Sequence, residues 1–139
     1  MEIHKIKSDI RIMCVQAESF PLGIGGAYTK LRSLLADPDN RKFFGISNPD
    51  ENGNIIYKAA AEEYYPGESE ALGLESFTIK KGDYISETLI NWKKDELQVS
   101  KVFQQLLQDK RIDPNGYCLE IYMNENDMMC LVPLELMNN

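Results

Sequence analysis

The feature that most constrains the fold is a repeated order of hydrophobic segments. Residues 10–62 show the periodicities of a strand, a helix and two further strands, and residues 84–134 show the same order. A shift of 72 positions places residues 34–37 (LLAD) on residues 106–109 (LLQD). The order predicts an internal duplication and an α+β fold. We expect a tandem strand–helix–strand–strand repeat that forms one curved antiparallel sheet, with helices on one face and a ligand cleft on the other.

The expected elements follow from the spacing of apolar residues and from turn signals between them. Strands are predicted at residues 10–17, 43–47, 55–62, 75–79, 84–90, 117–123 and 128–134, and helices at residues 22–36 and 95–109. Pro38 ends the first helix, because the residue before a proline avoids the helical region. Residues 1–8 are expected to form a flexible end that carries the only histidine, His4.

Length and charge limit the classes of partner. The 139 residues suffice for a single domain, 1–139, and the 22 acidic residues exceed the 15 basic ones to give a formal charge of −7. A nucleic-acid surface and an anionic membrane both require a basic face, so the charge argues against both partners. We expect a small-molecule ligand, and we leave a protein partner or a homodimer open as alternatives.

The sequence also indicates a compartment and excludes several chemistries. Neither a leader-like apolar segment nor an apolar run of about 20 residues is present, and Cys14, Cys118 and Cys130 lack the close spacing of a paired motif. These features are typical of a cytoplasmic protein with reduced thiols. With one histidine, neither a zinc site nor a Ser-His or Cys-His nucleophilic centre is expected, and we predict neither a metal nor a cofactor.

The net charge is concentrated in one segment. Residues 48–79 contain seven acidic residues and one basic residue, Lys58, and so supply six of the seven net negative charges. A solvated loop is the ordinary interpretation of such a run. The functional alternative is a weak electrostatic attraction for cations.

Glu120 is the strongest candidate for a functional side chain. It lies in the middle of a predicted strand, where glutamate has a poor propensity and burial is costly. Alternation puts Leu119 and Ile121 on one face and Cys118, Glu120 and Tyr122 on the other. We expect the apolar face to pack on the helices, which would leave Glu120 on the open face. There it would bind a cation or act as a general acid or base, unless that face is merely solvated.

Aromatic residues supply the expected wall of the ligand site. Tryptophan occurs once, as Trp92, and the chain has seven tyrosines, whose hydroxyl groups need partners when buried. For any single aromatic residue, packing in the core or on the surface is the alternative. The predicted ligand-binding set is Glu120, Tyr122, Trp92, Tyr84, Tyr57, Tyr65 and Phe44.

The glycine-rich segment 23–26 stands between a predicted strand and a predicted helix. A dinucleotide-binding fingerprint would need a third glycine where Tyr28 stands, and the repeated strand–helix–strand context of that fold is missing. We therefore expect the glycines to allow a tight turn or a close approach of the backbone to another segment.

The ordered segments resemble the GyrI-like small-molecule-binding domain, the effector-binding domain of bacterial transcription activators. The resemblance spans about residues 8–135 and rests on "IMCVQAESFPLGIGGAYTKLRSLL", "FFGISNPDENGNIIYKAAAEEYYPGE", "KKGDYIS", "FQQLLQDKRIDPNGYCLEIYMNEND" and "CLVPL". It implies a ligand cleft between two repeats, with Glu120 and Tyr122 matching a Glu-x-Tyr run in that cleft. Tyr84 and Trp92 resemble further cleft residues. The DNA-binding domain of the activators has no counterpart here, so the chain resembles the stand-alone form.

Three functions remain open from the sequence. The leading hypothesis is a stand-alone binding domain for an amphipathic cationic or polar aromatic effector or xenobiotic, with Glu120 as its polar anchor and a link to transcription regulation implied by the resemblance. The second is a hydrolase of electrophilic small molecules that uses Glu120 with Tyr84 or Tyr122. The third is an inhibitor of a topoisomerase-like protein, in which the acidic segment 48–79 imitates a phosphate backbone. We favour binding over catalysis.

Overall fold

A computed structural model describes residues 1–135, which form two compact units. The N-terminal unit is Asp9–Lys80, and the C-terminal unit combines residues 1–8 with the chain from residue 81 onward. Every strand pair within each unit is antiparallel, and helices pack on the strands, so the expected α+β class with antiparallel strands is confirmed.

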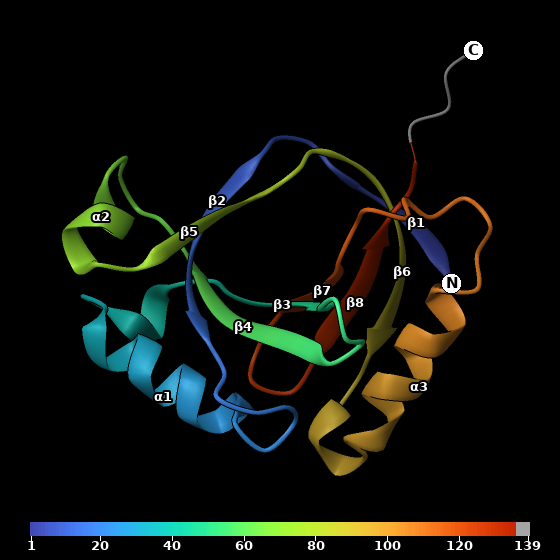
Figure 1. The fold of residues 1–139 in the computed structure, drawn as a ribbon, viewed down its shortest axis with the longest axis horizontal. Coiled ribbons are helices and arrows are strands. Elements are labelled where there is room, and N and C mark those ends of the chain that lie inside the picture. The colour runs from blue at the N-terminus through green and yellow to red at the C-terminus, as the bar shows by residue number, and fades with distance from the viewer. Residues whose placement is uncertain (136–139) are drawn as a thin grey trace. The chain divides into compact units, whose positions relative to one another are not determined.

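The N-terminal unit is a four-stranded sheet with a helix on one face. Its strands are β2 (Ile10–Gln16), β3 (Phe43–Pro49), β4 (Ile55–Glu62) and β5 (Glu75–Ile79), and its helices are α1 (Ile24–Leu34), a single turn η1 (Pro38–Asn40) and α2 (Glu68–Leu72). The strand order is β3-β4-β2-β5. Figure 1 shows α1 beside β2 and β4, and Ala27 and Leu31 of α1 pack on Met13, Tyr57 and Ala59.

The C-terminal unit repeats this arrangement. Its strands are β1 (Glu2–Ile6), β6 (Gly82–Leu89), β7 (Cys118–Tyr122) and β8 (Met128–Pro133), with a single turn η2 (Trp92–Lys94) and helix α3 (Leu97–Leu106). The strand order is β1-β6-β8-β7. Figure 1 shows α3 beside β6 and β8, and Val102 and Leu106 of α3 pack on Ile85, Cys130 and Val132.

The predicted strand–helix–strand–strand order is present in both units, and each unit gains one flanking strand. In both, the first strand of the repeat pairs with the third, and the third pairs with the second. In the C-terminal unit the flanking strand is β1, where Glu2 lies opposite Ser86 and Ile6 opposite Gly82. The expectation of a flexible end at residues 1–8 is therefore wrong, because pairing with β6 orders this segment.

The repeats align less simply than the shift of 72 indicates. That shift places Leu34 on Leu106, yet Leu106 is fully buried and Leu34 is 40% exposed. The buried leucines of this region are Leu31, inside α1, and Leu35, directly after it. The matching letters of the two helix ends therefore do not occupy matching positions in the packing.

Of the glycines in segment 23–26, only Gly23 makes the close approach expected of them. A Cβ atom on Gly23 would lie 2.6 Å from the backbone oxygen and 2.7 Å from the backbone nitrogen of Ser19. A Cβ atom on Gly25 or Gly26, inside α1, would have no neighbour within 4 Å. Only Gly23 is required by the turn.

This contrast predicts opposite effects for two similar substitutions. Gly23→Ala should lower the free energy of unfolding by about 1–3 kcal/mol, because the Ser19 backbone cannot move aside cheaply. Gly25→Ala should raise it by about 0.5–1 kcal/mol, because alanine restricts the unfolded chain and favours the helix. Urea unfolding followed by circular dichroism measures both. Equal effects of the two substitutions would contradict the conclusion that glycine is required at position 23 and not at position 25.

Candidate functional site

Glu120 lies on the face of its sheet that carries α3. Cys118 and Tyr122 of β7 pack against the cluster around α3. Glu120 lies between them in the strand, two residues from each, and so points to the same face. Glu120 also lies directly opposite Cys130 of β8, which belongs to the same cluster. The expectation that Leu119 and Ile121 would face the helix is therefore wrong. Alternation along a strand determines which residues share a face, but it does not determine which face a helix covers. The apolar surface of Cys118 and Tyr122 is sufficient to pack under α3.

Three of the predicted residues come together on this face. The Tyr122 hydroxyl donates a hydrogen bond of 3.1 Å to Oε1 of Glu120. The ring of Trp92, at the start of η2, lies 5.8 Å from the ring of Tyr122 between centroids, at an angle of 58°. All three side chains are half-buried. The cluster thus joins a carboxylate to two aromatic rings, the combination that binds organic cations.

Trp92 has an unsatisfied polar group. Its indole Nε1 is buried and has no hydrogen-bond partner among the residues that the structure describes. Buried N–H groups of tryptophan ordinarily find an acceptor, so this one carries a free-energy cost. The cation of Lys93 lies 5.8 Å from the centroid of the same ring.

The thiol beside the cluster is held in its protonated form. Burial raises the pKa of Cys130 most, and the electrostatic effects of Glu120, Cys118 and Glu87 raise it further. In the N-terminal unit burial raises the pKa of Cys14 to about 12. Neither Cys14 nor Cys130 forms a disulfide. Cys14 and Cys130 therefore lack the low pKa of a nucleophilic cysteine.

Tyr84 belongs to the opposite face of the same sheet. It is 1% exposed, and its hydroxyl lies 2.6 Å from the hydroxyl of Tyr117. Its neighbour along β6, Ile85, faces α3, so Tyr84 points away from that helix. The structure therefore does not bring Tyr84 to Glu120 and Tyr122 on the face that they share.

The remaining predicted residues lie in the N-terminal unit, in three different settings. Tyr57 is buried under α1, and its hydroxyl lies 2.9 Å from that of Tyr28. Phe44, 2% exposed, is on the other face of the sheet, because its neighbour Phe43 packs toward α1. Tyr65 is 55% exposed before α2. These three residues do not form one cluster within their unit.

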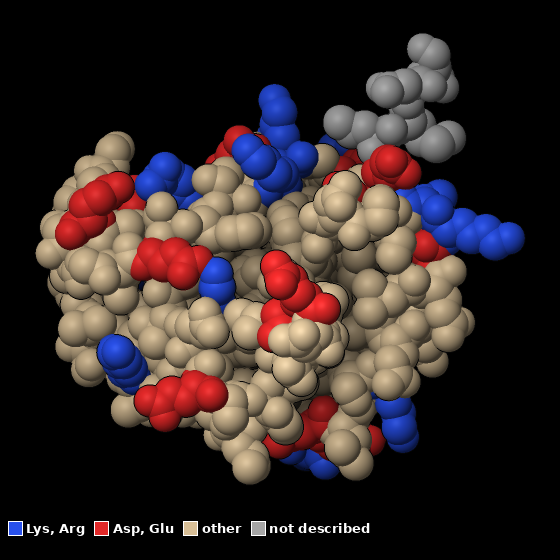
Figure 2. Space-filling view, in the orientation of Figure 1, with Lys and Arg blue, Asp and Glu red and all other residues tan. Residues whose placement is uncertain are grey.

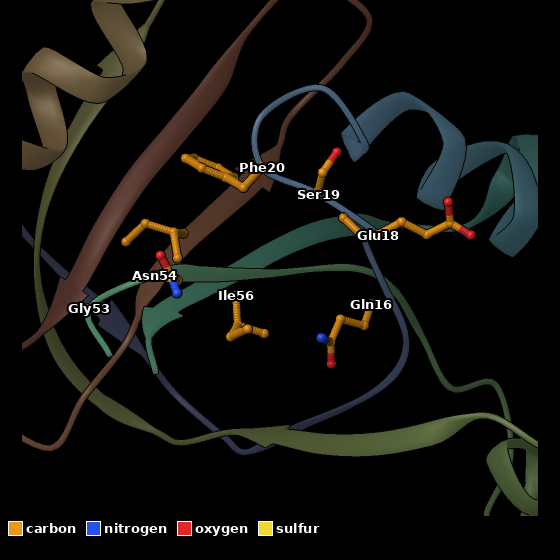
Figure 3. A pocket seen from close by; sticks show the side chains of 9 residues that line it. Gln16, Glu18, Ser19, Phe20, Gly53, Asn54 and Ile56 are labelled. Carbon is orange, nitrogen blue, oxygen red and sulfur yellow. The ribbon is translucent and has the colours of Figure 1, made fainter. Parts of the chain in front are cut away.

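A hollow of about 470 Å³ lies in the N-terminal unit between the β2–α1 connection and the β3–β4 turn. Gln16, Phe20 and Ile56 are among its lining residues, and Figure 3 shows the Glu18 side chain extending away from Gln16 and Ile56. Phe20 is 46% exposed and stacks on Tyr57 at 6.1 Å between centroids. Phe20 is not among the ligand-binding residues predicted from the sequence, although the shift of 72 places it on Trp92.

The acidic segment 48–79 contains inward-facing carboxylates. The Arg41 guanidinium donates two hydrogen bonds to Glu68, of 2.7 and 2.6 Å, and the ring of Tyr64 lies 3.8 Å from the guanidinium carbon. The Glu63 side chain is 4% exposed and accepts hydrogen bonds from Ser69. Figure 2 shows acidic and basic groups interspersed on the face drawn. Part of the segment's charge is thus neutralised inside the fold.

Residues 1–135 contain no group of three or more His, Cys, Asp or Glu side chains that could hold a metal ion. None of the helices described is long and apolar enough to cross a membrane.

Comparison with known proteins shows the fold. No family model and no curated protein matches the chain. An integron cassette protein from Vibrio cholerae has a TM-score of 0.68 at 14% identity, over 96% of this chain and 95% of that one. The protein SAV2435 bound to tetraphenylphosphonium has a TM-score of 0.67 at 12% identity, over 96% and 93%. A candidate bacterial transcription regulation protein from Staphylococcus aureus has a TM-score of 0.63 at 11% identity, over 97% of both chains. These neighbours are consistent with a GyrI-like fold, and none names a family.

Proposed function

We propose that the chain binds an amphipathic organic cation at the cluster of Glu120, Tyr122 and Trp92. The observation that carries this proposal is the half-buried Glu120 carboxylate with two aromatic rings beside it. The carboxylate supplies a charge partner in a partly desolvated place, and the ring faces add cation–π attraction. The tetraphenylphosphonium bound to one structural neighbour is a ligand of this chemistry.

The arrangement favours binding over nucleophilic chemistry. Burial holds the Cys130 thiol beside the cluster in its protonated form, and the carboxylate of Glu120 already accepts a hydrogen bond from Tyr122. A cation that approaches Glu120 can keep this hydrogen bond, because a carboxylate has lone pairs for several partners. The role that we propose for Tyr122 is to orient the carboxylate and to offer its ring to the ligand.

The test is a titration with tetraphenylphosphonium. Trp92 is the only tryptophan, so a change in its fluorescence reports on this site alone, and calorimetry gives the affinity independently. Glu120→Gln should weaken binding about tenfold, since it removes the charge and keeps the shape of the side chain. Neutral triphenylphosphine oxide should bind wild type and variant equally.

A second carboxylate variant controls for the overall charge of the protein. Glu70→Gln removes the same charge from an exposed position on α2 and should leave the affinity unchanged. If wild-type protein gives neither a fluorescence change nor a heat signal with tetraphenylphosphonium, the proposal fails. It also fails if both variants weaken binding equally, because the effect would then come from net charge.

A further inference from the structure

The segment that carries Trp92 connects β6 to α3, and its flanking residues Ile90 and Leu97 are 65% and 72% exposed. Trp92 packs against the cluster around α3, and two hydrogen bonds join the segment to the turn between β7 and β8. The backbone N–H of Trp92 donates to the backbone oxygen of Asn126 at 3.1 Å, and the backbone N–H of Asn91 donates to Oδ1 of Asp127 at 3.1 Å.

The Asp127 carboxylate is itself held in place. Its Oδ2 accepts a hydrogen bond of 3.0 Å from the side-chain amide of Asn124, and the Asp127 N–H donates to Oδ1 of Asn124 at 2.9 Å. The Asn124 and Asn91 hydrogen bonds lower the pKa of Asp127, so the carboxylate is ionised at neutral pH. Asn91 adopts a left-handed conformation with φ of 53°, which turns the chain into η2. One side chain thus joins the turn to the connection that carries the indole.

The N-terminal unit offers a natural comparison. Met128 and Tyr57 occupy corresponding places, since each faces the helix at the start of the returning strand. Asp127 precedes Met128 in the C-terminal unit, whereas Ile56 precedes Tyr57 in the N-terminal unit. In the N-terminal unit the turn carboxylate is Asp50, which accepts from the N–H groups of Asn52 and Asn54 within its own turn. There a hollow lies between the two connections, and Phe20 is 46% exposed.

We propose that Asp127 is a positioning residue for the ligand site: by holding the backbone of Asn91 it keeps the indole of Trp92 beside Tyr122. The effect of Asp127 on ligand affinity rests on the proposed function. Its effect on the position of the indole concerns the ligand-free protein and does not depend on that function. Without the carboxylate, the connection loses the side-chain link that joins it to the turn, and the indole moves away from the ring of Tyr122.

The test begins with Trp92 in ligand-free protein. Asp127→Ala should raise acrylamide quenching of Trp92 about twofold and shift its emission to the red, while the far-ultraviolet circular dichroism of the fold stays unchanged. The affinity for tetraphenylphosphonium should fall about fivefold. Asp127→Asn keeps an acceptor oxygen for the Asn91 N–H and should restore quenching and affinity to within about twofold of wild type.

A matched control comes from another turn of the same unit. Asp113 accepts a hydrogen bond of 2.9 Å from the Asn115 N–H, as Asp127 does from Asn91, and it lies in a different connection. Asp113→Ala should leave both quenching and affinity unchanged, although it removes a similar bond. If Asp127→Ala does not fold, Asn124→Ala is the milder variant, because it keeps the Asp127 carboxylate and removes the Asn124 hydrogen bonds that hold it. Its acrylamide quenching and its affinity for tetraphenylphosphonium are then measured in the same way.

The outcomes separate this inference from the proposed function. Quenching of the folded Asp127→Ala variant equal to that of wild type overturns the positioning role. Increased quenching with an unchanged affinity overturns it as well, because the indole position would then not matter for binding. If wild type does not bind tetraphenylphosphonium but quenching still rises in the variant, the proposed function fails while the placement of Trp92 by Asp127 stands.

Discussion

Replacing Arg41 with methionine is expected to lower the free energy of unfolding by about 3–5 kcal/mol, because the carboxylate of Glu68 would remain buried without its partner. The Arg41 side chain is 1% exposed and that of Glu68 is 5% exposed. Arg41 also donates to the backbone oxygens of Ala36 and Glu62, at 3.2 Å each. Its guanidinium therefore ties the end of α1, the end of β4 and helix α2 together.

The electrostatic setting of Glu68 explains the size of this effect. Hydrogen bonds from Arg41, and then from the backbone N–H of Tyr64, hold the pKa of Glu68 below its usual value, although burial opposes them. The pair therefore stabilises the fold fully above the unfolded pKa of a glutamate, and that contribution is lost as the pH falls through the lower folded pKa. The cost of Arg41→Met should accordingly be largest at neutral pH.

Urea unfolding followed by circular dichroism measures the effect, and two variants serve as controls. Arg32 forms an ion pair with Asp39 at the surface, and Arg32→Met should change stability by less than about 1 kcal/mol. The double variant Arg41→Met, Glu68→Leu should recover part of the loss, because it leaves no charge buried alone. A loss for Arg41→Met no greater than that for Arg32→Met would contradict the interpretation.

The second large effect is expected at the end of α3. Leu106→Ala should cost about 2–5 kcal/mol, because Leu106 is fully buried against the sheet and its truncation leaves a cavity. The adjacent Leu107 is 47% exposed, so Leu107→Ala should change stability by less than about 1 kcal/mol. The same urea titration compares the two. Similar losses for the two leucines would show that the face of α3 has been assigned wrongly.

Leu106 should also influence the ligand site, since α3 packs on the sheet face that carries Glu120 and Tyr122. The sequence favours Leu106 as the inner leucine, because Val99, Val102, Phe103 and Leu106 have the spacing of one helix face and Leu107 lies beside it. The structure confirms this, since Leu106 is fully buried and Leu107 is 47% exposed.

The burial of carboxylates in the acidic segment could not be predicted from the sequence. The sequence shows where the charges are, but a run of carboxylates has the same composition whether they face water or an arginine. Arg41 lies outside residues 48–79, and its pairing with Glu68 depends on the path of the chain between β4 and β5. Two of the seven carboxylates in this segment, Glu63 and Glu68, have side chains no more than 5% exposed and so cannot contribute to a phosphate-imitating surface.

Local pattern was sufficient for much of the fold. The alternation along the strands, the spacing in α1 and α3, and the turn signals between them specified the order of elements and the α+β class. Their physical basis is short-range, because side-chain direction follows from the backbone period alone. For the same reason the sequence placed Glu120 and Tyr122 together, two residues apart on one strand.

What the sequence left undetermined is everything that depends on contacts between distant segments. Three such features are the pairing of β1 with β6, the packing of α3 on the face that carries Glu120, and the hydrogen bonds of Asn91 and Trp92 to the turn between β7 and β8. In each case alternative arrangements would bury surfaces of similar polarity, and small differences in buried area decide which arrangement forms. The sequence by itself therefore determined the repeat and the candidate carboxylate, whereas the tertiary structure decided which aromatic residues accompany that carboxylate.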